Sequence, residues 1–119
     1  MDVNFETRLL VGDLIARCLD VGLSKSEVML IITGASGDVA TLLEEVNSSE
    51  VIETRVRHLL EVIKMASHIC GTEAEPWLRS SNGAFGLRSP IETLLEFPGA
   101  LSGMMHLMRR LGADGDTLH

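Results

Sequence analysis

The longest amphipathic pattern in the chain runs from residue 50 to residue 70, and it constrains how the rest of the sequence can fold. Its apolar side chains recur at helical spacing and fall on or near one face: Val51, Val56, Leu59, Leu60, Ile63, Ala66 and Cys70. Gly71 follows this run, as glycine commonly follows a helix. The pattern predicts one long helix that joins shorter helical segments on either side of it.

Start and stop signals divide the remaining sequence into short helices. The clearest start is Ser89-Pro90-Ile91-Glu92, which combines a capping box with a first-turn proline. The spacing of Ser24 with Glu27 and of Thr72 with Glu75 predicts two further capping boxes, and Ser36 is a cap by residue type alone. We expect helices over residues 5–21, 25–31, 37–46, 72–78, 89–97 and 98–111, a loop over residues 80–87, and Gly112 as the last terminator.

The types of apolar residue in the chain favour helices that pack on helices. Leu, Val, Ile, Met and Ala supply most of it, whereas Tyr is absent, Trp occurs once and Phe occurs 3 times. Sheets usually draw on aromatic and β-branched residues. The sequence therefore predicts an all-α fold.

The charge distribution supports a division into two units near Asn47. Residues 20–53 carry seven carboxylates against Lys25 alone, a net charge of −6, whereas residues 54–119 carry seven charges of each sign. We expect an N-terminal unit over residues 1–47 and a C-terminal unit over residues 48–119. The long helix would join them.

The N-terminal unit has the outline of a degenerate helix-turn-helix. Such a unit would place the helix over residues 37–46 in the major groove, with Ser36 and Thr41 near the bases and Lys25 as the flanking cation. Base edges are usually read by Arg, Lys, Asn or Gln, and the acidic stretch would repel a phosphate backbone. A structural or dimerising unit is the other interpretation, and the sequence favours it.

The sequence contains no pattern typical of a membrane span, a signal peptide, a metal site or a catalytic motif. No apolar run approaches the ~18 residues that span a bilayer, and the acidic N-terminus does not resemble a signal peptide. We expect a cytoplasmic protein with no cofactor, no metal site and no enzymatic activity, because no HExxH, CxxC or nucleophile-elbow spacing occurs. Cys18 and Cys70 are expected to be two buried thiols rather than a disulfide.

The C-terminal half contains an ordered set of motif residues, Trp77, Leu78, Asn82, Gly86, Pro90 and Leu94, followed by a closing amphipathic helix. This order resembles the toxin-binding domain of Xre/MbcA/ParS-type antitoxins. The resemblance covers about residues 54–112, and more weakly residues 9–47, where such antitoxins carry an Xre-like helix-turn-helix. Ser81 stands where the family usually has proline, and Leu87 where a second glycine is common.

The resemblance implies that the chain is an antitoxin for a RES-domain toxin, an enzyme that consumes NAD or uses it for ADP-ribosylation. In that family the C-terminal region covers the entrance to the toxin's active site. Carried over, the toxin-binding residues are Met104, Met108, Arg109, Arg110, Leu111, Gly112 and His119. The partner is then a protein toxin, and the assembly a homodimer or a hetero-oligomer with the toxin.

Other interpretations of these residues and of the chain stay open. Met104 and Met108 suit either a core or a docking surface, and adjacent Met104 and Met105 are not expected to face the same way. Arg109 and Arg110 could merely complement a helix C-terminus. A DNA-binding autoregulator and an immunity protein for a secreted effector are the alternative functions.

Overall fold

The computed structural model describes residues 4–81, 83–97 and 99–113, with Ala84 and residues 111–113 described by their backbone alone. The described residues are mostly helical and contain no β-strand, which confirms the all-α class. The elements are α1 (Phe5–Asp20), α2 (Lys25–Thr33), α3 (Val39–Ser48), α4 (Glu50–Cys70), the 3-10 turn η1 (Gly71–Glu73), α5 (Ala74–Arg79), the 3-10 turn η2 (Gly83–Phe85), α6 (Pro90–Glu96) and α7 (Ala100–Ala113).

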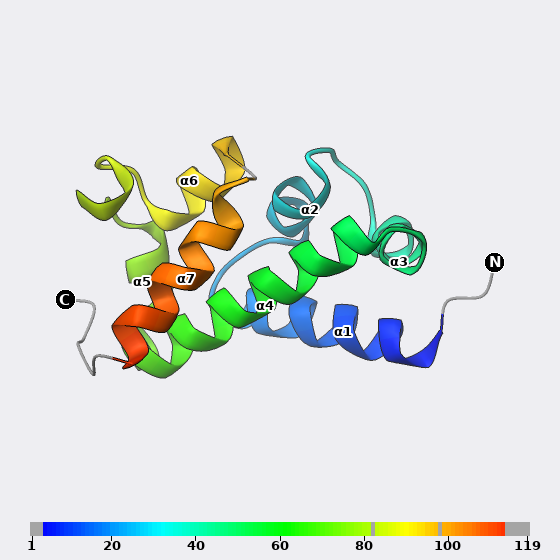
Figure 1. The fold of residues 1–119 in the computed structure, drawn as a ribbon, viewed down its shortest axis with the longest axis horizontal. Helices are drawn as coiled ribbons and strands as arrows, with labels where there is room; N and C mark the ends of the chain where they lie inside the picture. Colours follow the sequence, from blue (N-terminus) through cyan, green and yellow to red (C-terminus); the bar gives the residue numbers. More distant parts are fainter. Residues whose placement is uncertain (1–3, 82, 98, 114–119) are drawn as a thin grey trace.

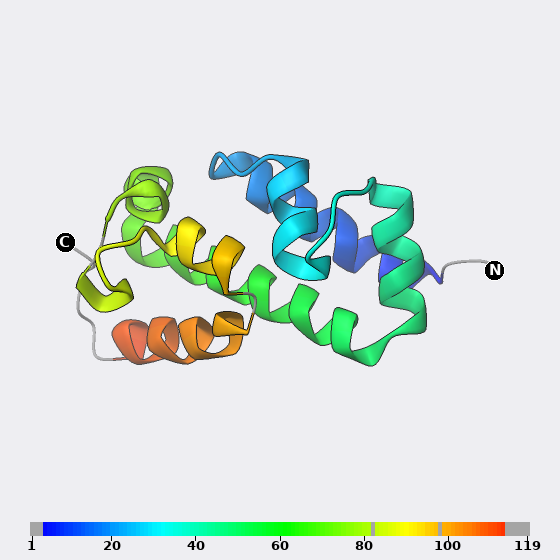
Figure 2. The same ribbon diagram turned by 90° about the horizontal axis from the view of Figure 1, so that it is seen from above.

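The long helix α4 lies at the centre of the molecule. Figures 1 and 2 show α1 and α7 on opposite sides of it, and both contact it. The helix therefore buries more than one stripe, and Leu59, Val62 and Ile63 are fully buried. Val51, which the sequence placed on the same apolar face, is 62% exposed instead.

One hydrophobic core runs through both halves of the chain. It includes Val11 and Leu14 of α1, Ile32 of α2, and Leu94 and Met108 of the C-terminal half. α2 also contacts α6 directly. Both cysteines are free thiols as expected, and burial raises the pKa of Cys18 to about 12, although Cys70 is only partly buried.

Two of the three capping boxes that the sequence predicts are confirmed. Ser24 accepts a hydrogen bond from the backbone N–H of Glu27 (3.1 Å), and the Glu27 carboxylate accepts one from the backbone N–H of Ser24 (2.9 Å). Ser89 and Glu92 form the same reciprocal pair. These bonds satisfy amides that a helix start otherwise leaves without a partner.

The predicted start of the third helix was wrong by two residues. Asp38, not Ser36, is the cap, because its carboxylate accepts from both the backbone N–H and the hydroxyl of Thr41, each at 2.8 Å. A carboxylate that accepts two hydrogen bonds is a stronger cap than a serine hydroxyl placed too early for the first turn.

The expected boundaries around α5 and α7 also need correction. No side chain caps the start of α5: the backbone passes through Gly71 at φ +58° and forms η1 first, so Thr72 does not open a capping box. The last helix begins at Ala100, and Gly112 lies within it instead of ending it. The predicted start at Pro98 lies outside the described residues.

Candidate functional site

The start of α6 is fixed by the cap predicted from sequence. Ser89 is only 2% exposed and Pro90 occupies the first position of the helix. The hydroxyl of Thr93 adds a hydrogen bond to the Ser89 carbonyl (2.9 Å). The backbone N–H of Ser89 also lowers the pKa of Glu92, so this cap is formed by a carboxylate that stays ionised.

The loop before α6 is held by an aromatic contact. Trp77 of α5 packs edge-to-face against Phe85 of η2, with ring centroids 6.4 Å apart at 71°. Beneath them, Leu78 and Leu94 are fully buried. Among the predicted motif residues, Trp77, Leu78, Pro90 and Leu94 thus join the packed scaffold around the loop, whereas Asn82 lies outside the described residues.

The end of this loop carries a residue in an unfavourable backbone conformation. Gly86 has φ +64°, which glycine adopts freely, but the next residue, Leu87, has φ +69°. This left-handed conformation costs a leucine residue about 1–2 kcal/mol of free energy. Leu87 is nevertheless 76% exposed, so its side chain gains almost nothing from the core in return.

The other end of α6 carries an exposed aromatic residue. Phe97, at the C-terminal end of α6, is 51% exposed. The Arg88 guanidinium lies 5.5 Å from the Phe97 ring centroid and also pairs with Glu96. Arg88, next to Leu87 in the chain, therefore spans α6 and holds Phe97 in place, and we call Leu87, Arg88 and Phe97 the α6 surface.

The methionines of α7 lie in the core, which corrects their proposed role as a partner-binding surface. Met104 is 2% exposed, Met105 is 4% exposed and Met108 is fully buried. Met104 and Met105 are both buried, although adjacent residues of a helix point in different directions. α7 packs on α4 and contacts α6 as well, and a helix held by two neighbours buries adjacent positions.

The two arginines near the end of α7 have different environments. Arg109 forms a double hydrogen bond with Glu61 of α4 (2.8 and 2.7 Å), and this contact lowers the pKa of the Glu61 carboxyl. Arg110 is exposed and forms no ion pair with another described residue. The side chains of Leu111 and Gly112, and His119 altogether, lie outside the described residues.

Arg79 is a structural residue that no sequence pattern singled out. Its guanidinium donates two hydrogen bonds to the Glu27 carboxylate (2.8 and 2.7 Å) and one to the carbonyl of Gly22 (2.6 Å). Gly22 has φ +86°, and the Glu75 carboxylate occupies the space that a Cβ would need there. Arg79 therefore ties α5 to the α1–α2 turn, across 52 residues of sequence.

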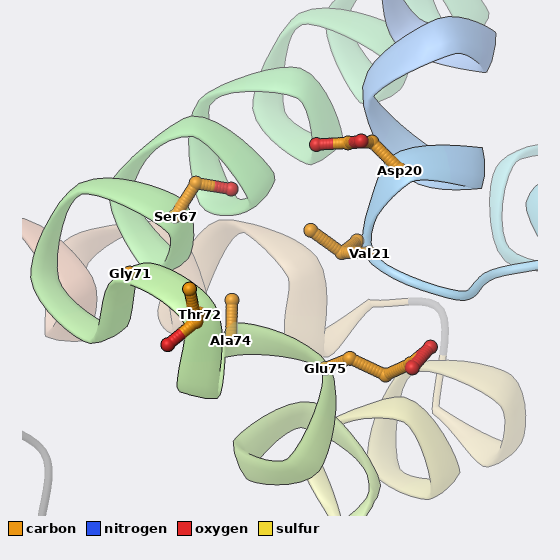
Figure 3. A pocket seen from close by; sticks show the side chains of 7 residues that line it. All are labelled: Asp20, Val21, Ser67, Gly71, Thr72, Ala74 and Glu75. Carbon is orange, nitrogen blue, oxygen red and sulfur yellow. The ribbon is translucent and has the colours of Figure 1, made fainter.

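An open cavity of about 370 Å³ lies beside this link, between the ends of α1 and α4 (Figure 3). Its lining residues are Asp20, Val21, Ser67, Gly71, Thr72, Ala74 and Glu75. Two carboxylates and two hydroxyls thus surround a floor of buried Val21 and Ala74. None of the residues predicted to bind toxin or DNA lines it.

The candidate DNA-binding residues lie on separate parts of the N-terminal unit. Lys25 is the first residue of α2, Ser36 lies in the turn that follows α2, and Thr41 lies in the first turn of α3. All three are exposed. Hydrogen bonds from Thr41 lower the pKa of Asp38, so this end of α3 carries a negative charge that disfavours a phosphate.

The described residues contain neither a cluster that could hold a metal ion nor a helix that could span a membrane. No three His, Cys, Asp or Glu side chains are close enough to hold a metal ion. None of the helices combines the length and the apolar composition needed to cross a membrane.

Comparison with known proteins gave no relative: no family model, no curated protein and no solved structure matches this chain.

Proposed function

We propose that the chain is a cytoplasmic antitoxin that binds a RES-domain toxin and covers the entrance to its active site. The toxin class rests on the resemblance of Trp77, Leu78, Gly86, Pro90 and Leu94 to the toxin-binding motif. The proposal assigns no catalysis to the chain itself. Its working part is a protein-binding surface on the C-terminal half.

The observation that carries the protein-binding part is the α6 surface. A strained leucine that is 76% exposed costs stability and adds nothing to the core. Exposed leucine and phenylalanine side chains at the two ends of α6, linked by Arg88, have the composition of an interface patch. Contact with a partner would bury Leu87 and Phe97, and this gain offsets the strain.

The end of α7 supports a second contact. Because Arg109 is held by Glu61, Arg110 is the arginine left available to a partner or to the space that a phosphate-bearing substrate would occupy. The tail beyond residue 113 follows directly. The proposal therefore assigns fewer residues to the interface than the sequence-based one: Met104 and Met108 belong to the core, and Arg110 and the tail contact the toxin.

Co-expression with the product of the adjacent gene tests this function. The wild-type chain should restore growth and cellular NAD, whereas Leu87→Gly should protect less although it relieves backbone strain. Val51→Ala is the matched control, because Val51 is similarly exposed but lies at the start of α4. Arg110→Glu should also reduce protection, with Lys25→Glu as the control of equal charge change.

Two results would contradict the proposal. Full protection by a chain that carries both Leu87→Gly and Arg110→Glu would show that these residues do not contact the toxin. Unchanged cellular NAD in cells that express the neighbouring gene alone would show that its product is not an NAD-consuming toxin. Sequence-specific binding of the free chain to its own promoter, lost in Lys25→Glu, would favour the DNA-binding alternative, and a secreted neighbour would favour the immunity protein.

A further inference from the structure

Helix α1 has two apolar faces, and the fold uses one of them. Val11, Leu14 and Cys18 are buried against the rest of the molecule. The opposite face carries five exposed residues without charge or polar groups: Phe5, Leu9, Gly12, Ala16 and Leu19. Their spacing alternates between four and three residues, which is the spacing of a coiled-coil seam. We call this face the α1 stripe.

Gly12, at the centre of the stripe, has no explanation within the chain. It lies in the middle of a helix, where glycine is less favourable than almost any other residue. A Cβ at this position would meet no atom within 4 Å, so the fold does not require glycine there. Close approach of a second helix is a physical reason for a residue without a side chain at this point.

We propose that the α1 stripe is a self-association surface on which the α1 helix of a second copy packs antiparallel. The stripe has bulky residues in its first half, Phe5 and Leu9, and small residues in its second half, Gly12 and Ala16. An antiparallel copy places Phe5 level with Ala16 of the second copy and Leu9 level with its Gly12. Two-fold symmetry repeats both contacts, as in an isologous dimer.

Side-chain size distinguishes this register from an alternative antiparallel register of the same seam. The alternative antiparallel register places Leu9 against Leu19 and Gly12 against Ala16. Bulky residues then meet bulky ones, and small residues face each other across a gap. A parallel arrangement has the same defect, because each residue would meet its own copy.

Charge along one edge of the stripe is complementary in the proposed register. Asp13 is close to two cations, with Arg17 Nε at 2.9 Å and Lys64 Nζ at 3.8 Å, so this group has a net charge of +1. Glu6 of the second copy falls level with residue 15 on the same edge, between Asp13 and Arg17. The symmetric dimer gains this attraction twice.

The exposed area indicates a reversible dimer. Phe5 is 73% exposed, Leu9 57% and Leu19 49%. Two stripes bury on the order of 800 Å² in total, less than the roughly 1,200 Å² of stable interfaces, so we expect dissociation at micromolar concentrations. Because α7 lies across α4 from α1 (Figure 2), the dimer leaves the end of α7 accessible, and the inference does not depend on the proposed function.

Sedimentation equilibrium of the full chain tests the dimer. Gly12→Gln should raise the melting temperature, because glutamine favours helix, and should raise the dimer dissociation constant by roughly tenfold or more, because its side chain blocks close approach. Gly103→Gln is the matched control: Gly103 is an exposed mid-helix glycine of α7 with equally open space. It should raise the melting temperature and leave the dissociation constant unchanged.

Cysteine cross-linking tests the register in a Cys70→Ser background, where the remaining Cys18 is buried. A mixture of Phe5→Cys and Ala16→Cys chains should form a disulfide under air oxidation. Neither chain should do so alone, because identical positions lie about 16 Å apart along the axis.

A chain that is monomeric at every concentration up to the millimolar range would overturn the proposal. Cross-linking of Phe5→Cys alone would overturn the antiparallel register. Equal weakening of the dimer by Gly12→Gln and Gly103→Gln would show that the α1 stripe is not the interface.

Discussion

Replacement of Arg79 by alanine should destabilise the molecule through a single identifiable link. Arg79 makes three hydrogen bonds, two of them to a carboxylate. It is the main reason why the pKa of Glu27 is lowered from 4.5 to about 2, a change equivalent at face value to about 3 kcal/mol. The Arg79 side chain is 41% exposed and water screens the pair, so we expect a loss of about 1.5 kcal/mol at pH 7.

The loss should depend on pH in a direction that the pKa of Glu27 sets. Its pKa is lower in the folded chain than in the unfolded chain, so the unfolded chain binds a proton first as the solution is acidified. The stabilisation is complete above about pH 4.5 and falls as the pH approaches 2. The difference between wild type and Arg79→Ala should therefore shrink across that interval.

Urea unfolding followed by circular dichroism at pH 7, 4 and 3 measures this difference. Glu27→Gln keeps an acceptor for the Ser24 cap and removes the charge, so the double variant with Arg79→Ala separates the pair from the cap. Arg57→Ala is the control, because the Arg57–Glu53 contact is 3.6 Å long and exposed, and should cost less than about 0.5 kcal/mol. Equal losses of stability in the two arginine variants, or an Arg79→Ala loss that is unchanged at pH 3, would show that the Arg79–Glu27 pair does not provide this stability.

Three further substitutions test the scaffold by thermal and urea unfolding. Leu87→Gly should raise the free energy of unfolding by about 1 kcal/mol, because glycine adopts φ +69° without strain; a decrease would mean that the leucine side chain has a packing role. Ser89→Ala should lower it by about 1 kcal/mol through loss of the cap, while Ser102→Ala on the exposed face of α7 should leave it within about 0.5 kcal/mol. Met104→Ala should cost about 2–5 kcal/mol if the residue is a core member, and an effect as small as that of His106→Ala, at an exposed position of the same helix, would contradict its burial.

Two helix starts with a local and reciprocal cap were readable from the sequence, whereas the same pattern at Thr72 and Glu75 failed because the chain forms η1 there first. Ser24 with Glu27 and Ser89 with Glu92 each satisfy both partners within four residues, so no tertiary contact is needed to recognise them. Asp38 was missed because Ser36, two residues earlier, is also a good cap by type. The choice between them depends on where the turn after α2 ends, which local sequence does not determine.

The contacts between distant residues could not be read from one sequence. The partners Arg79 and Glu27 are separated by 52 residues, and Arg109 and Glu61 by 48. The sequence contains many other pairs of opposite charges and does not indicate which of them meet. The buried position of Met104 depends in the same way on where α4 and α6 lie. Leu87 has a left-handed backbone conformation, in which glycine would be unstrained.

The double use of Glu27 has a consequence for how the molecule unfolds. One carboxylate closes the first turn of α2 and also holds Arg79 at the end of α5, so neither contact can be lost without weakening the other. Opening of the amides at the start of α2 is thereby coupled to detachment of α5 from the α1–α2 turn. The two halves of the chain should exchange their amide hydrogens as one cooperative unit at this junction, and a substitution at residue 27 acts on both halves at once.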